Sequence, residues 1–227
     1  MSQCRGAVVG VDGCRSGWLA VAIEASGRRH FQVLNSITDV EIMAPAIVAI
    51  DMPIGLPETG VRTCDLAARQ FLGPSRNRVF TGARRPLLMH VESYDLANAW
   101  GKSDRRGISK QLFCILPKIA EVDNYLRSRT TQFPIRETHP ELVFQRLNDG
   151  KHLAGKKSPT GLRHRRDLVY ARGFDQIDEW LGALRGTGAK PDDLLDACAC
   201  AFAAKSGQRL QCDEESDACG LPMEMWY

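Results

Sequence analysis

Residues 8–23, VVGVDGCRSGWLAVAI, consist of two apolar runs separated by a short polar turn. The first run reaches Asp12, and the chain then turns through CRSG before the second run begins. Two apolar runs joined by a short link that contains glycine are typical of a β-hairpin. We therefore predict a strand over 7–12 and a second strand over 17–24. The acidic side chain at the end of the first strand is either a turn residue, since Asp favours turns, or a functional group.

Three further segments complete a predicted sheet. HFQVLN (30–35) follows another short turn and extends the hairpin to an antiparallel meander. AIVAID (46–51) is a continuous apolar run ended by Met52-Pro53, which is typical of a buried parallel strand. FPIRET (133–138) is the fifth strand, and right-handed crossovers place strand four beside strand one. The predicted fold is α/β: a mixed five-stranded sheet with strands 4 and 5 parallel to strand 1, covered by helices in the ribonuclease H-like topology.

Hydrophobic periodicity and turn residues also predict the helices. One long helix carries Pro117 in its interior, so we expect a kink or a break there. We predict a single domain over 1–227 with a helical insertion at about 60–130 and a polar C-terminal tail over 207–227. The predicted helices cover about 37–43, 62–72, 93–100, 109–128, 140–147, 163–172, 175–184 and 191–205.

Composition restricts the class of protein. The chain has 227 residues and a formal net charge of +3, so overall charge does not mark a nucleic-acid binder, and any basic surface must be local. Its eight cysteines form no CxxC pair, which argues against a zinc ribbon or a thioredoxin motif. Cys212 and Cys219 have a spacing that fits either a disulfide or a metal site without specifying one. The N-terminus lacks the apolar core of a signal peptide and no stretch is long enough to span a membrane, so we expect a cytoplasmic protein.

Three carboxylates are candidates for one metal site. Asp12 and Asp51 end two neighbouring parallel strands, so both should emerge at the sheet edge where ligands bind in α/β proteins. Asp196 lies in a helix that is apolar almost all round, where a carboxylate needs a partner or a metal. Clustered carboxylates favour a hard cation such as Mg²⁺ or Mn²⁺. Two such ions about 3.5–4 Å apart would activate a water for attack on a phosphodiester.

The acids also have structural explanations. Asp51 can accept hydrogen bonds from the loop that follows it. Asp192 and Asp193 follow Pro191 and can complement the positive end of a helix, as Glu141 can in the first turn after Pro140. Glu137 ends the fifth strand.

Several motifs together resemble one known family. GVDGCRSGW, AIDMPIGLP, CDLAARQFLG with SRNRVF, GISKQLFCILPKIAEVD, ETHPELVF and DDLLDACACAFAA occur in the order found in the DUF429 family, over about residues 6–205. The sequence departs from that family's pattern at GARRP, after SRNRVF. The family is a group predicted to be ribonuclease H-like nucleases, so the resemblance implies that fold and activity. By similarity to such enzymes, above all the Holliday-junction resolvases, it implies catalytic acids from strand one, strand four and the last helix: Asp12, Asp51, and Asp193 with Asp196. Glu137 or Glu141 either adds a further ligand or is peculiar to this family.

Basic residues gather in two polar loops and are candidate contacts for phosphate oxygens. SRNRVFTGARR supplies Arg76 and Arg78 together with Arg84 and Arg85, and GKKSPTGLRHRR supplies Lys156 and Arg165. The alternative for each is a solvated surface charge. Lys110 and Gln111, before the long helix, are candidate substrate contacts through the family resemblance alone.

Three functions compete. The first is a metal-dependent nuclease or phosphodiesterase that acts on nucleic acid. The second is phosphoryl transfer on a nucleotide or sugar, since GVDGCRSGW also resembles the first phosphate loop of the actin-like ATPase and sugar-kinase superfamily. Those proteins generally use two such domains, so this chain would either form a homodimer or lack ATP binding. The third is a non-catalytic module that binds nucleic acid or protein.

Overall fold

The chain divides into two compact units. The computed structural model describes residues 6–128, 131–213 and 215–227. The first unit is drawn from Met1–Asp51, Gln132–Arg209 and Trp226–Tyr227, and the second from Met52–Thr131 and Leu210–Met225. The helical segment expected at about 60–130 falls within the second unit.

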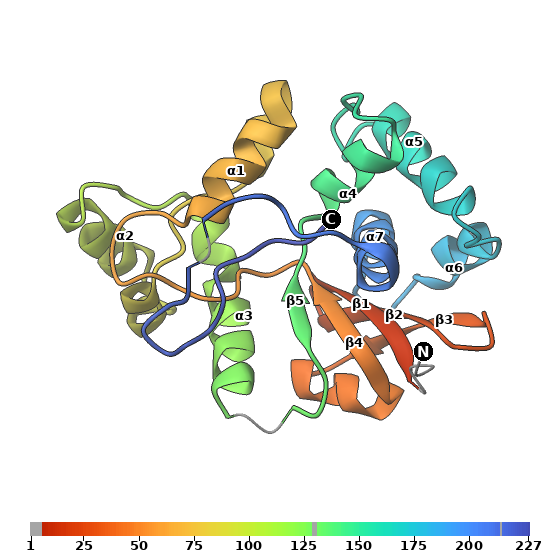
Figure 1. Ribbon diagram of the computed structural model, residues 1–227, viewed down its shortest axis with the longest axis horizontal. Coiled ribbons are helices and arrows are strands. Elements are labelled where there is room, and N and C mark those ends of the chain that lie inside the picture. Colours follow the sequence, from red (N-terminus) through yellow and green to blue (C-terminus); the bar gives the residue numbers. More distant parts are fainter. Residues whose placement is uncertain (1–5, 129–130, 214) are drawn as a thin grey trace. The chain divides into compact units, whose positions relative to one another are not determined.

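A mixed five-stranded sheet forms the centre of the first unit (Figure 1). The strand order is β3-β2-β1-β4-β5, with antiparallel pairing from β1 to β3 and parallel pairing of β4 with β1 and of β5 with β4. This confirms the predicted α/β sheet and its strand directions. The strands are β1 (Ala7–Cys14), β2 (Gly17–Ile23), β3 (Arg29–Leu34), β4 (Pro45–Ile50) and β5 (Ile135–Glu137).

The first hairpin is longer than predicted. Strand β1 continues to Cys14, which pairs with Gly17, so the turn consists of two residues only. The expectation that Asp12 ends its strand was wrong, because cross-strand pairing with β2 carries β1 two residues further. The parallel pairing of β1 with β4 does stop at Val11. Asp12 is therefore the first residue beyond that ladder, as expected of a residue at the carboxyl edge of the parallel strands.

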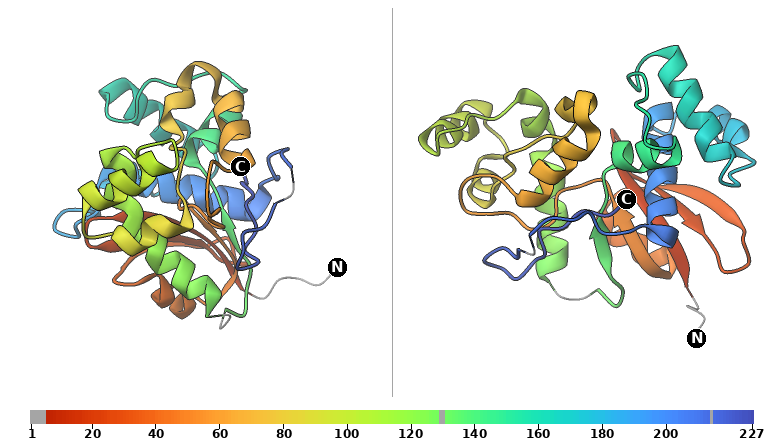
Figure 2. Two further views of the ribbon diagram at one scale, coloured as in Figure 1. Left: turned by 90° about the vertical axis from the view of Figure 1, so that its left-hand side faces the viewer. Right: turned by 45° about the horizontal axis from the view of Figure 1, so that its top comes forward.

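The two faces of the sheet are covered by different helices. Figure 2 shows α7 (Pro191–Ser206) on one side of the sheet and the short 3-10 helix η1 (Ile37–Met43) on the other. Leu19 and Val21 of β2 belong to the core that α7 shares with the sheet. Because side chains alternate along a strand, every second residue of β1 and β4 also faces α7.

Three more helices of the first unit surround α7: α4 (Pro140–Leu147), α5 (Pro159–Tyr170) and α6 (Ile177–Ala183). Helix α5 begins four residues before its predicted start. Ser158 caps it by accepting a hydrogen bond from the backbone of Gly161 at 3.0 Å, and Pro159 fits the first turn.

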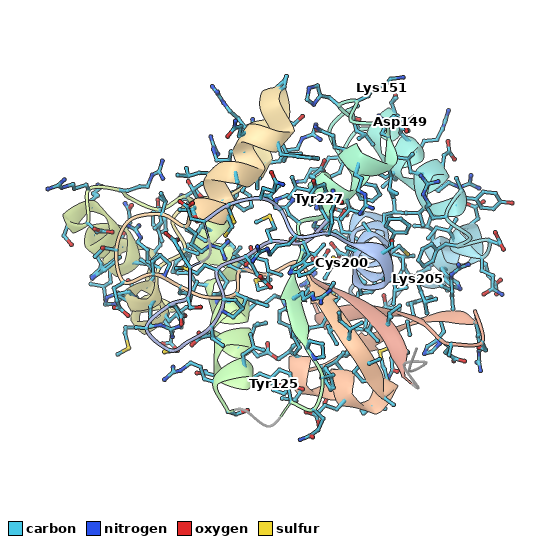
Figure 3. All side chains as sticks on the ribbon, in the orientation of Figure 1. Tyr125, Asp149, Lys151, Cys200, Lys205 and Tyr227 are labelled. Carbon is cyan, nitrogen blue, oxygen red and sulfur yellow. The ribbon has the colours of Figure 1, made fainter. Side chains whose placement is uncertain are left out.

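Helix α7 lies against β1 at backbone distance. A Cβ atom on Gly10 would lie 1.9 Å from the backbone nitrogen of Ala201 and 2.2 Å from the carbonyl oxygen of Ala197. Beside it, Ala49 of β4 packs on Cys200, a fully buried residue labelled in Figure 3. The small residues of DACACA therefore set the distance between helix and sheet.

The second unit contains α1 (Thr63–Leu72), η2 (Gly73–Arg78), η3 (Arg85–His90), α2 (Tyr94–Ser103) and α3 (Lys110–Arg127). The break considered at Pro117 does not occur, because α3 is one continuous helix. The basic loop expected after α1 begins within η2 and ends at the start of η3, and residues 79–84 between them lie outside these helices. Among the residues that the structure describes, no helix has both the length and the apolar character needed to cross a membrane.

Paired arginines hold the second unit together. Arg85 contacts both oxygens of Asp123 at 2.9 Å and also pairs with Asp217 of the C-terminal segment. Fully buried Arg84 pairs with Asp104 at 2.7 Å. The two arginines at the point where the sequence departs from the family pattern thus have structural partners. In the described part of the chain no disulfide joins Cys212 to Cys219.

We predict that Gly10→Ala destabilises the protein. The added methyl group has no space against the α7 backbone, and overpacking of this kind costs about 1–3 kcal/mol. The matched control is Gly182→Ala in α6, where a Cβ meets nothing within 4 Å and should stabilise the helix by up to about 1 kcal/mol. Urea unfolding of both variants measures the difference, and equal stabilities would contradict the close approach.

Candidate metal centre

Three carboxylates from three elements meet on the α7 side of the sheet. They are Asp12 of β1, Asp51 directly after β4, and Asp196 in α7. One oxygen from each lies within 4.8 Å of the others. All three residues belong to the first unit.

The packing of α7 explains why these side chains converge. Gly10 and Ala49 are neighbours in the parallel ladder and both face α7, Ala49 against Cys200. Two residues further along each strand come Asp12 and Asp51, about 6.6 Å away and on the same face. One turn back along α7 from Cys200 comes Asp196, about 6 Å away. Two residues along a strand thus cover nearly the same length as one turn of α7, so all three carboxylates lie at about the same distance from the contact of Gly10 and Ala49 with the helix.

The cluster is largely shielded from water. Asp12 is 8% exposed and Asp196 is 1% exposed, whereas Asp51 is half-buried. Burial, reinforced by the charges of Asp51 and Asp196, raises the pKa of Asp12 well above its usual value. Burial likewise raises the pKa of Asp51 to about 6 and that of Asp196 to about 7, against the opposing effect of the Lys156 ammonium. Three like charges in one shielded site are costly without a cation.

Lys156 supplies one positive charge to this cluster. Its Nζ donates to Oδ2 of Asp196 at 2.5 Å. Burial acts to lower the pKa of Lys156, but the carboxylates of Asp196 and Asp12 outweigh it and raise that pKa above its usual value. The ammonium therefore remains charged beside the carboxylates.

The oxygens left over suit a divalent metal ion. Oδ1 of Asp196 is buried and has no hydrogen-bond partner among the residues that the structure describes, which is costly for a carboxylate oxygen. Oδ1 of Asp12 accepts only a local bond from the backbone of Gly13, at 2.7 Å. Carboxylate oxygens at this spacing are the donor set preferred by Mg²⁺, Mn²⁺ or Ca²⁺. The residues present thus fit a bound hard cation, although they do not specify which one.

Glu141 and Arg165 form a buried pair next to this centre. Arg165 is fully buried, and its Nη2 contacts both oxygens of Glu141 at 2.8 Å. Its Nη1 donates to the carbonyl oxygens of Ala154 and Gly161, each at 2.9 Å. Arg165 therefore ties α4 and α5 to the loop that carries Lys156.

The other two predicted acids have different surroundings. Asp193 accepts a bond from the backbone of Lys190 at 2.8 Å and so caps α7, and burial raises its pKa above the usual value. Glu137 is the last residue of β5 and pairs with Ile50. Since Ile50 alternates with Ala49, Glu137 belongs to the sheet face away from α7.

The predicted substrate contacts are divided between the two units. Lys156 and Arg165 lie in the first unit, while Arg76, Arg78, Lys110 and Gln111 lie in the second. Arg76 is exposed and, with Arg69, lines an open cavity of about 530 Å³. Lys110 and Gln111 are exposed at the start of α3, with the Lys110 Nζ 5.9 Å from the centre of the Tyr94 ring.

Thr138 is a neighbour of the site that sequence reasoning passed over. It follows Glu137, and its backbone nitrogen donates to the carbonyl oxygen of Ile50 at 2.9 Å, which places it beside Asp51. Its side chain is buried, and within the described part of the chain Oγ1 has no hydrogen-bond partner. The signal was available, because alternation along FPIRET puts Thr138 on the face opposite to Glu137.

Comparison with family models matches residues 10–217 to DUF429, described as a protein of unknown function. The match covers most of the chain, includes the three carboxylates and confirms the resemblance seen in the sequence. No curated protein and no solved structure matches the chain.

We predict that Glu141→Gln destabilises the protein by about 3–5 kcal/mol. The substitution leaves the buried guanidinium of Arg165 without its counter-charge, which is the usual cost of breaking a buried ion pair. Glu179→Gln, on the exposed surface of α6, should stay within about 0.5 kcal/mol of wild type. Chemical unfolding checks both, and a Glu141 variant as stable as the control would show that the pair contributes nothing.

We also predict that the acidic cluster makes the metal-free protein less stable as pH rises. A raised pKa means that the folded state still holds a proton at a pH where the unfolded chain, with a pKa of about 3.9, has released it. The free energy of unfolding therefore decreases between about pH 4 and the folded pKa values of about 6 to 7. Asp51→Asn removes one such group. It should raise the free energy of unfolding on the order of 2 kcal/mol at about pH 8 and have little effect at about pH 4.

Urea unfolding in the presence of a chelator, with wild type and Asp51→Asn compared at each pH, measures this difference. A difference that stays constant across the range, or that is largest in acid, would be inconsistent with a carboxyl group whose pKa is raised by burial.

Proposed function

We propose that this chain, which belongs to the DUF429 family, is a divalent-metal-dependent hydrolase of phosphodiester bonds in nucleic acid. The observation that carries the proposal is the convergence of Asp12, Asp51 and Asp196, with one oxygen of each within 4.8 Å of the others. A sheet of this strand order, with acids on strand one, after strand four and on the last helix, is the arrangement of ribonuclease H-like nucleases. On the same grounds we propose that the fold is ribonuclease H-like.

The roles of the three acids follow from their chemistry. Asp12, Asp51 and Asp196 would hold Mg²⁺ or Mn²⁺. When bound, the cation supplies Lewis-acid stabilisation of the phosphoryl oxygens and an acidified water as nucleophile. The carboxylates place that chemistry at the edge of the sheet, where Asp51 is half-buried and a substrate phosphate has access to the site.

Several basic residues are proposed to contact the substrate. Lys156 already lies against Asp196, with its side chain 36% exposed. Arg76, Arg78, Lys110 and Gln111 are proposed contacts to the nucleic-acid backbone from the second unit. Arg165, which the sequence offered as a further substrate contact, is fully buried against Glu141. It instead anchors the loop that carries Lys156, by donating to the carbonyl oxygen of Ala154.

Asp12→Asn and Asp51→Asn should each lower metal-dependent cleavage at least about 100-fold. Each removes a charged metal ligand, and even outer-shell changes at metal sites cost about 10- to 100-fold. Cleavage of labelled single-stranded, duplex and junction substrates, as DNA and as RNA, with Mn²⁺ and with a chelator, measures the effect. The matched control is Asp175→Asn, which removes an exposed carboxylate in the same unit and should leave cleavage unchanged.

Undiminished cleavage in both site variants would refute the proposal. Circular dichroism of each variant separates loss of activity from loss of fold. A thermal shift of the wild-type protein with ATP and metal, together with an absence of cleavage, would instead favour phosphoryl transfer on a nucleotide.

A further inference from the structure

Lys156 places its ammonium against the acidic cluster of Asp12, Asp51 and Asp196, in contact with Asp196. Its Nζ lies 2.5 Å from Oδ2 of Asp196, closer than an ordinary surface ion pair. We propose that the Lys156 ammonium fills one cation position of the acidic cluster, so that the site takes a single divalent metal ion and not a pair. The inference rests on the proposed function only in assuming that the three acids bind a metal.

The number of available donor atoms supports one ion. Among the residues that the structure describes, only Asp12, Asp51 and Asp196 form a group with metal-ligand spacing. The next two acids have other partners, since Glu141 directs both oxygens at Arg165 and Asp193 caps α7. Of the remaining oxygens, Oδ2 of Asp196 binds Lys156.

The spacing of the donor atoms supports the same number. Opposite ligands of one Mg²⁺ ion are about 4.2 Å apart, since each metal–oxygen distance is about 2.0–2.1 Å. The three carboxylate oxygens lie within 4.8 Å of one another, slightly more than this span, so a single ion reaches all three after a small inward shift of the side chains.

Charge balance also favours a single ion. Three ionised carboxylates carry three negative charges, and the ammonium of Lys156, paired with Asp196, cancels one of them. One divalent cation cancels the other two and leaves a neutral site. A second divalent cation would leave an uncompensated double positive charge in a site where two of the acids are buried, which is strongly unfavourable.

The loop that carries Lys156 is anchored on both sides of it. On one side, Arg165 donates to the carbonyl oxygen of Ala154 at 2.9 Å. On the other, Ser158 caps α5, and its backbone nitrogen donates to the carbonyl oxygen of Gly155 at 2.9 Å. Figure 3 labels Lys151 where the loop begins, just after α4. These bonds fix the backbone under Lys156, so its ammonium is held at the cluster by the fold.

Counting bound Mn²⁺ ions tests the proposal without any assay of activity. Isothermal titration calorimetry should give one Mn²⁺ per chain for the wild type, and electron paramagnetic resonance should show an isolated ion and no coupled pair. Lys156→Met empties the cation position and should raise the stoichiometry two-fold, to a spin-coupled pair. Lys157→Met, an adjacent exposed lysine, is the matched control and should bind one ion.

The possible outcomes separate this inference from the proposed function. Two Mn²⁺ ions in the wild type, or one ion in a folded Lys156→Met variant, would overturn the inference and leave the proposed function standing. No binding of Mn²⁺ by the wild type would refute the proposed function itself. The wild-type stoichiometry decides the matter even if the lysine variant does not fold, which circular dichroism would reveal.

Discussion

The backbone contact between α7 and β1 is the constraint on which the site depends. Gly10 leaves room for Ala197 and Ala201 to lie directly against the strand, and Ala49 does the same for Cys200. With larger side chains the helix would stand further from the sheet, and Asp196 would not reach the carboxylates of the strands. The small residues set the distance between α7 and the sheet, and that distance determines whether the three carboxylates meet.

The close packing of α7 on the sheet also brings three carboxylates together in a place that is largely shielded from water. Burial raises the pKa values of Asp51 and Asp196, which means that burying their ionised forms costs free energy. Favourable interactions elsewhere in the fold must offset this cost. Lys156 relieves part of that repulsion, and its position depends in turn on the buried pair of Arg165 with Glu141. Stability is lost at functional sites in this way in many proteins, because the geometry that chemistry needs differs from the one that folding alone would favour.

Much of the sheet and of the acidic cluster could be predicted from the sequence, because both follow from periodic patterns. The continuous apolar run at 46–51 predicted a buried parallel strand, and an acid inside the apolar helix at 191–205 indicated that Asp196 has a partner. The position of Lys156 could not be predicted, since it depends on hydrogen bonds from Arg165, 9 residues further along, to a loop without periodicity. The roles of Arg84 and Arg85 were hidden for a related reason: a basic stretch looks the same whether it faces solvent or pairs with distant aspartates.

The pairing of Arg85 with Asp217 joins residues 132 positions apart, and the backbone of Leu56 bonds to the same aspartate. During synthesis, Met52–Thr131, the larger part of the second unit, is therefore made well before Leu210–Met225, the segment that carries Asp217. Gln132–Arg209 of the first unit, which includes α7, is made during that interval. The acidic cluster has the same dependence, because Asp12 and Asp51 are synthesised long before Asp196. Each unit is thus completed by a segment made after the rest of it, Leu210–Met225 for the second unit and Trp226–Tyr227 for the first.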